Sequence, residues 1–191
     1  LLNQFNEYII RQKNPFKINT IQDNIEKSEK EEIKQTLKNI KYVITLDADT
    51  DLVLNTAQEL VGAMAHILNK PVIDEQKNIV VDGYGIMQPR VGVNLDISYK
   101  TLFTKIFAGA GGIDSYTNAI SDIYQDYFKE GIFTGKGIYD VDVYNGILKD
   151  EFPENTILSH DLLEGNFLRC GLLTDVMLLD GYPFRYIPYM F

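Results

Sequence analysis

Lys41-Tyr-Val-Ile-Thr-Leu-Asp-Ala-Asp-Thr50 joins an apolar run rich in β-branched residues to two carboxylates. Val, Ile and Thr favour extended structure, so the run predicts a strand over residues 41–46. Because side chains alternate along a strand, Asp47 and Asp49 are expected to point the same way, with Ala48 pointing opposite. Carboxylate oxygens are hard ligands that suit Mg²⁺ or Mn²⁺. The pair therefore indicates a site for a divalent cation that carries a diphosphate, as in nucleotide-sugar chemistry.

The same Asp-Ala-Asp pattern has two other interpretations. Acidic residues after a strand often accept hydrogen bonds within a turn or cap the next helix. The pattern also approaches the Asp-X-Asp-X-Thr signature of phosphotransferases, in which the first Asp is the nucleophile and Thr lies four positions later. Here that position is Asp51, and the threonine comes one residue early, at Thr50. The spacing disfavours a nucleophilic role for Asp47, and the choice between metal binding and a turn remains open.

Length, composition and charge predict one acidic domain. The chain has 191 residues, of which 45% are hydrophobic and 12% aromatic, and its formal charge is −9. This is enough for one core of sheet and helices. The charge argues against a nucleic-acid partner, because no cluster of Lys and Arg can neutralise a phosphate backbone. A ligand that carries phosphate therefore needs a metal or local hydrogen-bond donors.

Several features bear on the compartment. Cys170 is the single cysteine, so no internal disulfide is possible and a reducing cytoplasm suits the chain. No apolar run approaches the roughly 20 residues that span a bilayer, and no signal peptide is evident, so we expect a soluble chain. The chain begins without Met and ends on the apolar residues 186–191. We therefore expect it to be a piece of a longer protein.

The first part of the chain predicts two helices and a polar connection. Apolar residues at helical spacing predict an amphipathic helix over residues 1–12, whereas residues 14–38 have the composition of a solvated loop and helix face. Asn55-Thr-Ala-Gln58 has the form of a helix cap and begins a second predicted helix that reaches about residue 69. The stripe expected to be buried on this helix consists of Leu60, Met64, Ile67 and Leu68.

The rest of the chain predicts strands and further helices. Ile79–Val81 and Tyr84–Val91 are extended, and Gly83 permits a bend between them, as in a hairpin or strand pair. Helical spacing then returns over residues 98–108 and 117–129. The alternation of strands and helices predicts an α/β fold.

A second group of polar residues is Ser159-His160-Asp161-Leu-Leu-Glu164, at the predicted start of a helix. Asp161 and Glu164 have the spacing of a capping box, in which each side chain bonds a backbone N–H of the first turn, and Ser159 is an alternative cap. Alternatively, a carboxylate at a cleft acts as a general base when it reaches the hydroxyl of an acceptor, with His160 orienting it or contacting phosphate.

A glycine-rich loop is predicted over residues 131–140, where Gly135 and Gly137 flank Lys136. It fails the P-loop pattern at Gly137, which argues against that mode of triphosphate binding. The loop is either a close approach of the backbone to a sugar or an ordinary tight turn. His66 lies in the predicted helix without metal-ligand spacing, and packing explains it better than catalysis.

Together these motifs resemble the glycosyltransferase domain of cyclic β-1,2-glucan synthases, from about residue 40 to residue 186. The stretches that carry the resemblance are Tyr42-Val-Ile-Thr-Leu-Asp-Ala-Asp-Thr50, Met87-Gln-Pro-Arg-Val91, Phe133-Thr-Gly-Lys-Gly-Ile-Tyr-Asp-Val141 and Pro153-Glu-Asn-Thr-Ile-Leu-Ser-His-Asp-Leu-Leu-Glu-Gly165. That family is related to processive inverting transferases such as cellulose synthase. The resemblance implies a GT-A fold, with a mixed sheet flanked by helices, and transfer of glucose from UDP-glucose to a β-1,2-linked glucan acceptor.

The resemblance also implies roles for particular residues. Asp47 and Asp49 match the metal-binding Asp-X-Asp, with Mg²⁺ or Mn²⁺ as the cofactor and Asp49 as the more direct ligand. Asp161 matches the catalytic base that ends Thr-Glu-Asp in the cellulose synthase relatives. Ser159-His160 replaces Thr-Glu here, so His160 is expected to bind substrate without an assigned role.

For the acceptor, the match is the segment Phe133, Thr134 and Gly135, which borders the acceptor sugar in those relatives. The physical account agrees with these assignments. Asp161 would take the proton from an acceptor hydroxyl as that hydroxyl attacks the anomeric carbon of the donor, while the cation stabilises the departing UDP.

We expect residues 1–191 to be part of one transferase domain, with a helical and polar segment over 1–40 and the metal, acceptor and base portion over 41–191. The expected parent is a larger membrane-embedded protein at the cytoplasmic face of the inner membrane. The uridine-binding part and the Gln-X-X-Arg-Trp type of motif are expected outside this chain, which would leave the isolated fragment inactive. The competing hypothesis is a noncatalytic glucan-binding or scaffold domain that keeps the fold.

Overall fold

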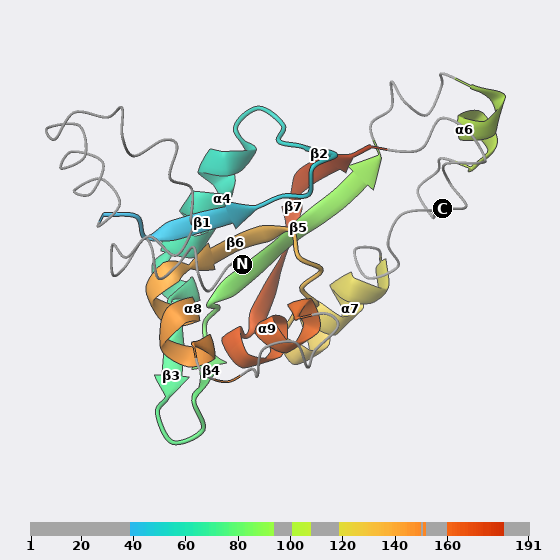
Figure 1. Ribbon diagram of the computed structural model, residues 1–191. Coiled ribbons are helices and arrows are strands. Elements are labelled where there is room, and N and C mark those ends of the chain that lie inside the picture. Colours follow the sequence, from blue (N-terminus) through green and yellow to red (C-terminus); the bar gives the residue numbers. More distant parts are fainter. Residues whose placement is uncertain (1–38, 94–100, 108–118, 150, 152–159, 182–191) are drawn as a thin grey trace, which may run out of the picture.

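A computed structural model describes residues 39–93, 101–107, 119–149, 151 and 160–181. The described chain forms a mixed sheet of five strands in the order β1-β6-β5-β7-β2 (Figure 1). Strands β5 and β7 run parallel, and the other neighbours are antiparallel. The strands are β1 (Tyr42–Thr45), β2 (Thr50–Asp51), β5 (Ile86–Val93), β6 (Gly137–Asp140) and β7 (Cys170–Asp180).

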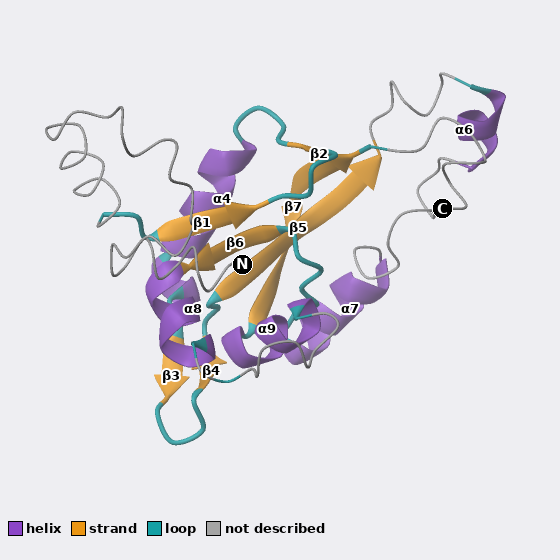
Figure 2. Ribbon diagram, in the orientation of Figure 1, coloured by secondary structure: helices purple, strands orange, loops and turns teal. Residues whose placement is uncertain are grey.

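The two faces of the sheet carry separate apolar clusters, because neighbouring residues of a strand point to opposite faces. Ile86 pairs with Tyr139 across β5 and β6, and both side chains are buried in a cluster with α8 and α9. The next pair, Met87 and Ile138, is buried on the other face against α4. Helices therefore flank the sheet on both sides (Figure 2). They are α4 (Thr56–Ala65), α8 (Val141–Leu148) and α9 (Asp161–Leu168).

These features confirm the predicted α/β class. The expected strand over residues 41–46 is β1, and the chain has a mixed sheet flanked by helices. Within the helices expected over residues 98–108 and 117–129, the described residues form α6 (Leu102–Phe107) and α7 (Ala119–Phe128). The helix expected over residues 1–12 and the polar segment over 14–38 lie outside the described residues. None of the described helices is long and apolar enough to cross a membrane.

The extended segment before β5 pairs differently from the prediction. Strand β4 (Ile79–Asp82) forms an antiparallel hairpin with β3 (Val72–Asp74), not with the segment that follows Gly83. Gly83 has a φ of +64°, and a Cβ there would overlap the carbonyl group of Lys70. Glycine tolerates both conditions. The chain therefore leaves the hairpin at Gly83 and enters the main sheet as β5.

Helix α4 ends earlier than predicted. Leu60 and Met64 are buried as expected, but Ile67 and Leu68 are 74% and 81% exposed. The helix stops at Ala65 because His66 is extended, and the Nδ1 atom of His66 accepts a hydrogen bond of 3.3 Å from the backbone N–H of Leu68. The segment continues as a short 3₁₀ turn, η1 (Ile67–Asn69). The apolar residues that continue the helical spacing beyond Ala65 are therefore not part of a buried helix face.

Asn55 precedes α4, but it does not cap the helix in the expected way. Its φ is 70°, and its side chain makes no capping hydrogen bond. Asn tolerates the left-handed conformation better than most residues do. Asn55 therefore serves as the left-handed residue that turns the chain into α4.

Candidate active site

The Asp-Ala-Asp motif lies in a turn beyond the end of β1. Strand β1 stops at Thr45, and the backbone N–H of Thr50 donates to the carbonyl oxygen of Asp47 over 3.1 Å. Strand alternation predicts that Asp47 and Asp49 point the same way, but both residues lie in the turn after β1, where that rule does not apply. Both residues are exposed. The motif thus lies in the turn that leads from β1 at one edge of the sheet to β2 at the other.

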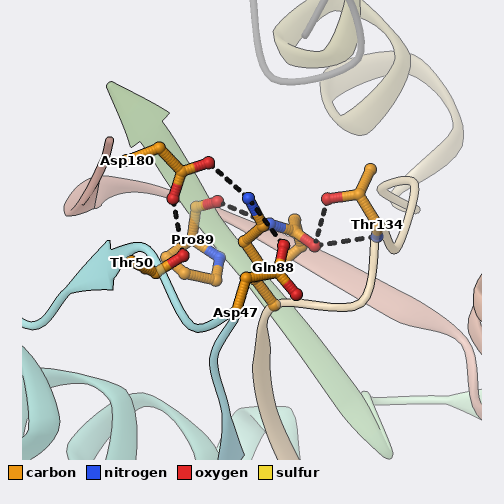
Figure 3. Close-up of polar contacts among 7 residues, drawn as sticks. Asp47, Thr50, Gln88, Pro89, Thr134 and Asp180 are labelled. Atoms are coloured by element: carbon orange, nitrogen blue, oxygen red, sulfur yellow. Dashed lines mark hydrogen bonds and ion pairs between the residues drawn. The ribbon is translucent and has the colours of Figure 1, made fainter. Parts of the chain in front are cut away.

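Lys136 connects this turn to the end of β7, and its partners Asp47 and Asp180 are labelled in Figure 3. Its Nζ atom lies 3.1 Å from Oδ2 of Asp47 and forms an ion pair with Asp180. The hydroxyl of Thr50 donates to the other carboxylate oxygen of Asp180 over 2.6 Å. The side chain of Asp180 is only 5% exposed, whereas that of Asp47 is 59% exposed. One ammonium group thus bridges a buried and an exposed carboxylate.

The ion pairs also set the protonation state of Lys136. Burial acts to lower the pKa of its ammonium group, because the charged form loses hydration. The hydrogen bonds to Asp180 and Asp47, together with the attraction of both carboxylates, outweigh burial and raise the pKa above its ordinary value. Lys136 is therefore a permanent cation at physiological pH.

Asp49 lies beside the end of β7 as well. The backbone N–H of Gly181 donates to the carbonyl oxygen of Asp49 over 2.9 Å. A Cβ built at Gly181 would lie 3.3 Å from the Cβ of Asp49, so the two backbones approach closely. The end of β7 therefore holds both ends of the motif: Asp180 acts on Asp47 through Lys136, and Gly181, the residue after the strand, bonds Asp49 directly.

The loop before β6 is held by a buried glutamine. Gln88 of β5 is fully buried, and its Oε1 accepts hydrogen bonds from the backbone N–H of Thr134 over 2.9 Å and from the Thr134 hydroxyl over 3.1 Å. Its Nε2 donates to the carbonyl oxygen of Pro89 over 2.9 Å. Phe133 is buried, and a Cβ built at Gly165 would lie 3.0 Å from its Cβ. The loop is thus pinned on both sides of its backbone.

Gly135 brings Asp161 to this loop. A Cβ built at Gly135 would lie 3.3 Å from Oδ2 of Asp161, so the carboxylate lies directly against the glycine. Gly135 has a φ of +91°, which other residues rarely adopt. Because Lys136 follows Gly135, the loop has Asp161 beside one residue and Asp47 beside the next. The residues predicted for base and metal are therefore linked through one loop.

At the start of α9, Asp161 is the first helical residue and is half-buried, while His160 is exposed and its side chain does not cap the helix. The capping-box interpretation paired Asp161 with Glu164. In the structure Glu164 is buried, and its Oε1 accepts a hydrogen bond of 2.6 Å from the hydroxyl of Tyr144 in α8. Glu164 therefore joins α9 to α8, which leaves the capping-box interpretation without its second member.

Burial raises the pKa of the Glu164 carboxyl, and the nearby Asp161 carboxylate adds to this effect. The hydrogen bond from Tyr144 acts in the opposite direction but does not cancel it. The pKa of the Tyr144 hydroxyl is also raised, mainly by burial and then by the charge of Glu164. Glu164 is thus a carboxyl group of raised pKa that lies in the same helical turn as Asp161.

The donor set at the turn fits a divalent cation in composition. Asp47 and Asp49 are exposed carboxylates on one turn, and Mg²⁺ commonly uses one or two carboxylates together with water and substrate phosphate. Among the described residues, no group of three or more His, Cys, Asp or Glu side chains is placed to hold a metal ion. A cation here would therefore depend on ligands that the substrate and water supply.

Two residues of this site were missed from the sequence. Gln88 lies inside β5, directly after Ile86 and Met87, and Asp180 follows Leu178 and Leu179 at the end of β7. A polar residue directly after apolar residues of a strand is the signal that could have found them, although it does not identify a partner. Lys136 was noted only as a loop residue, and β6 begins at Gly137, inside the segment expected to be a loop.

The fold and the site define an α/β domain with clustered carboxylates at one edge of a mixed sheet. No family model matches the chain. The chain is 46% identical over 148 residues to the cyclic β-(1,2)-glucan synthase NdvB of Rhizobium meliloti. The match covers 77% of this chain but only 5% of that synthase. The chain is therefore related to cyclic β-(1,2)-glucan synthase, as its motifs predicted, and corresponds to a small part of that protein.

Proposed function

We propose that this chain is part of an inverting glucosyltransferase that moves glucose from UDP-glucose to a growing β-1,2-glucan. Its relation to the synthase of Rhizobium meliloti supports this class of reaction. The observation that carries the proposal is the contact of Asp161 with Gly135, next to the ion pair between Lys136 and Asp47. Residues far apart in the chain thereby form one site with the composition that glycosyl transfer needs.

In this proposal Asp161 is the general base. Its half-buried carboxylate takes the proton from the acceptor hydroxyl, whose oxygen attacks the anomeric carbon of glucose as the bond to UDP breaks. A single in-line displacement inverts the anomeric centre and needs no covalent intermediate. The first turn of α9 suits this role, because the N-terminus of a helix stabilises nearby negative charge.

Asp47 and Asp49 would hold Mg²⁺ or Mn²⁺ in the proposed enzyme. When bound, such a cation neutralises the negative charge that develops on the departing diphosphate. The exposure of both side chains supports this role, since it leaves them accessible to a ligand from solution. Lys136 holds Asp47 from the side of β7 and so keeps one of its oxygens in place.

The acceptor sugar is proposed to lie along Phe133, Thr134 and Gly135, with His160 at the same edge. The loop is held through Gln88, and the absence of a side chain at Gly135 lets the carboxylate of Asp161 lie directly against the loop. A sugar that binds along this loop would therefore bring its hydroxyl close to the base. The exposed position of His160, directly before Asp161, makes it a further contact for substrate.

We propose a GT-A fold within a larger protein. The related synthase is far longer than the matched stretch, and this supports a parent in which other segments complete the donor site. The parent is proposed to be embedded in the inner membrane, with this part at its cytoplasmic face. Residues 1–191 by themselves are proposed to be inactive.

The test is the incorporation of labelled glucose from UDP-glucose into glucan by the complete parent protein. Asp161→Asn should lower the rate by about 100-fold or more, since it removes the general base, and Asp49→Asn should lower it by removing a metal ligand. Asp142→Asn is the matched control. Asp142 is also an acidic residue in the first turn of a helix, α8, and it is exposed.

Near-native transfer by Asp161→Asn would mean that Asp161 serves only the start of α9, and the base would have to be another residue. If the native parent transferred no glucose but bound glucan, the noncatalytic binding domain would become the better description. A loss of equal size in Asp142→Asn would show that the assay reports helix stability rather than chemistry.

A further inference from the structure

We propose that Lys136 binds the diphosphate of the sugar-nucleotide donor through its ammonium group. This inference rests on the proposed function and adds a donor-binding residue to it. The sequence pattern around Lys136 fails the P-loop spacing, so the role follows from its position among carboxylates and glycines, not from a motif.

The first support is the way the ammonium group is anchored. Asp180 is almost fully buried and contacts Lys136 from the core side, while Thr50 occupies the other oxygen of the same carboxylate. From this anchor the ammonium group reaches Asp47, whose side chain is 59% exposed. The side chain of Lys136 itself is 13% exposed. The buried Asp180 therefore fixes the ammonium group from the core side, and the group lies near the solvent beside Asp47, a proposed metal ligand.

The second support is the number of donors. An ammonium group has three N–H donors and no acceptor. The contacts with Asp180 and Asp47 account for two of them, and no other described residue takes the third, which leaves it for a ligand at the exposed side. Hydrogen bonds from an ammonium group to phosphate oxygens are charge-assisted and stronger than neutral ones. A diphosphate recognised at Asp47 would thus come within reach of a fixed cation.

The third support is the space around the residue. Glycines flank Lys136, and a Cβ at Gly137 would overlap the carbonyl oxygen of Met87 in β5. Glycine at this position lets β6 approach β5 closely, and Gly135 lets the carboxylate of Asp161 lie directly against the loop. No side chain from the immediate neighbours of Lys136 in sequence therefore covers the ammonium group.

A Lys136 that binds diphosphate and a Lys136 that is purely structural predict different losses of affinity for different ligands. If Lys136 only neutralised the buried Asp180, its removal would disturb every ligand of the site alike. If Lys136 binds the diphosphate, its removal should weaken UDP and spare uridine, which has the same base and sugar but no phosphate. The ratio of the two affinities is therefore the decisive quantity.

The experiment uses the complete parent protein with Mg²⁺. Equilibrium dialysis measures the affinity for radiolabelled UDP, and competition with unlabelled uridine measures the affinity for uridine. Lys136→Met should weaken UDP binding by about 10- to 100-fold, the usual range for losing a charged hydrogen bond, and should leave uridine binding unchanged. Lys136→Arg keeps the charge and should lose less affinity for UDP than Lys136→Met does.

Lys77→Met is the matched control, because Lys77 also pairs with an aspartate, Asp74, but lies in the exposed β3–β4 turn. It should leave both affinities unchanged. A second variant, Lys136→Met with Asp180→Asn, protects the test against misfolding, since it removes the buried carboxylate charge together with its partner. The double variant should show the same selective loss for UDP.

Equal losses for UDP and uridine in the Lys136→Met variant and in the double variant would overturn the inference and leave Lys136 as the structural partner of Asp180. If the native parent bound no UDP at all, the proposed function would fail and the inference would fall with it. Unchanged UDP binding in a folded Lys136→Met variant would overturn the inference while leaving the proposed function intact.

Discussion

At the scale of single residues, buried polar side chains hold the site together. Gln88 has all of its side chain in the interior and satisfies two donors of Thr134. Asp180 does the same for Thr50 and Lys136. Buried polar groups are costly unless each has a partner, so such contacts hold the surrounding segments to a single arrangement. The loop and the turn that carry the candidate active-site residues are both held in this way.

Glu164 leads to a prediction about pH. Burial raises the pKa of its carboxyl in the folded protein, so the folded state binds this proton more tightly than the unfolded state does. The stabilisation is complete at low pH and is lost as the pH rises from the ordinary value toward the raised one. Glu164→Gln cannot titrate. The unfolding free energy of this variant, relative to the native chain, should therefore increase over that pH range by up to about 1.4 kcal/mol per pH unit.

Chemical unfolding of the chain at a series of pH values, followed by circular dichroism, measures this difference. Glu59→Gln is the control, since Glu59 is an exposed carboxyl in the first turn of α4, and its substitution should change the unfolding free energy by less than about 0.5 kcal/mol. A difference for Glu164→Gln that stays flat across the pH series would contradict the assigned cause.

At the scale of elements, the close approach of β5 and β6 depends on glycine. Gly137 begins β6, and a Cβ there would overlap the carbonyl oxygen of Met87. Gly137→Ala must push the two strands apart or distort β6, and strain of this kind typically costs about 1–3 kcal/mol. Because Lys136 precedes Gly137, we expect the same change to disturb the ion pairs with Asp47 and Asp180.

Gly146→Ala is the matched test of this prediction. Gly146 lies in α8, and no atom lies within 4 Å of a Cβ built there. The substitution should stabilise the chain by about 0.5–1 kcal/mol, because alanine loses less conformational entropy in a helix. Unfolding by denaturant distinguishes the two variants, and changes of the same sign in both would refute the steric explanation for Gly137.

At the scale of the whole molecule, the parallel pairing of β5 with β7 brings the site together. It places Gln88 and Asp180 on neighbouring strands. Strand β6, which follows Lys136, pairs with β5, and β2, which contains Thr50, pairs with β7. The chain carries a formal charge of −9, so it repels a free diphosphate over the range in which salt does not screen it. In the proposed function, a divalent cation bound at the turn would offset this repulsion.

Removal of divalent metal should therefore abolish UDP binding to the complete parent protein while changing uridine binding little. Equilibrium dialysis of UDP with Mg²⁺ and with an excess of chelator tests this expectation, and restoring Mg²⁺ or Mn²⁺ is the control. UDP binding that survives chelation would show that Lys136 and other local donors are sufficient, and it would remove the proposed role of Asp47 and Asp49 as metal ligands.

The sequence by itself determined the α/β class, strand β1, the buried positions Leu60 and Met64, and the relation to the synthase. Each of these depends on local periodicity or on a long motif, and both are visible in a single chain. It also singled out Asp47, Asp49 and Asp161 as candidate residues, whose roles remain proposals.

Only the tertiary structure decided which distant residues meet. The partner of Lys136, the contact of Thr134 with Gln88 and the pairing of Glu164 with Tyr144 all join separate elements. The end of α4 at Ala65 and the turn at Asp47 also depend on contacts outside the local pattern. Periodicity reports which face of an element is apolar, but not which element covers it. The packing of the sheet and its helices settles that choice, and with it the arrangement of the site.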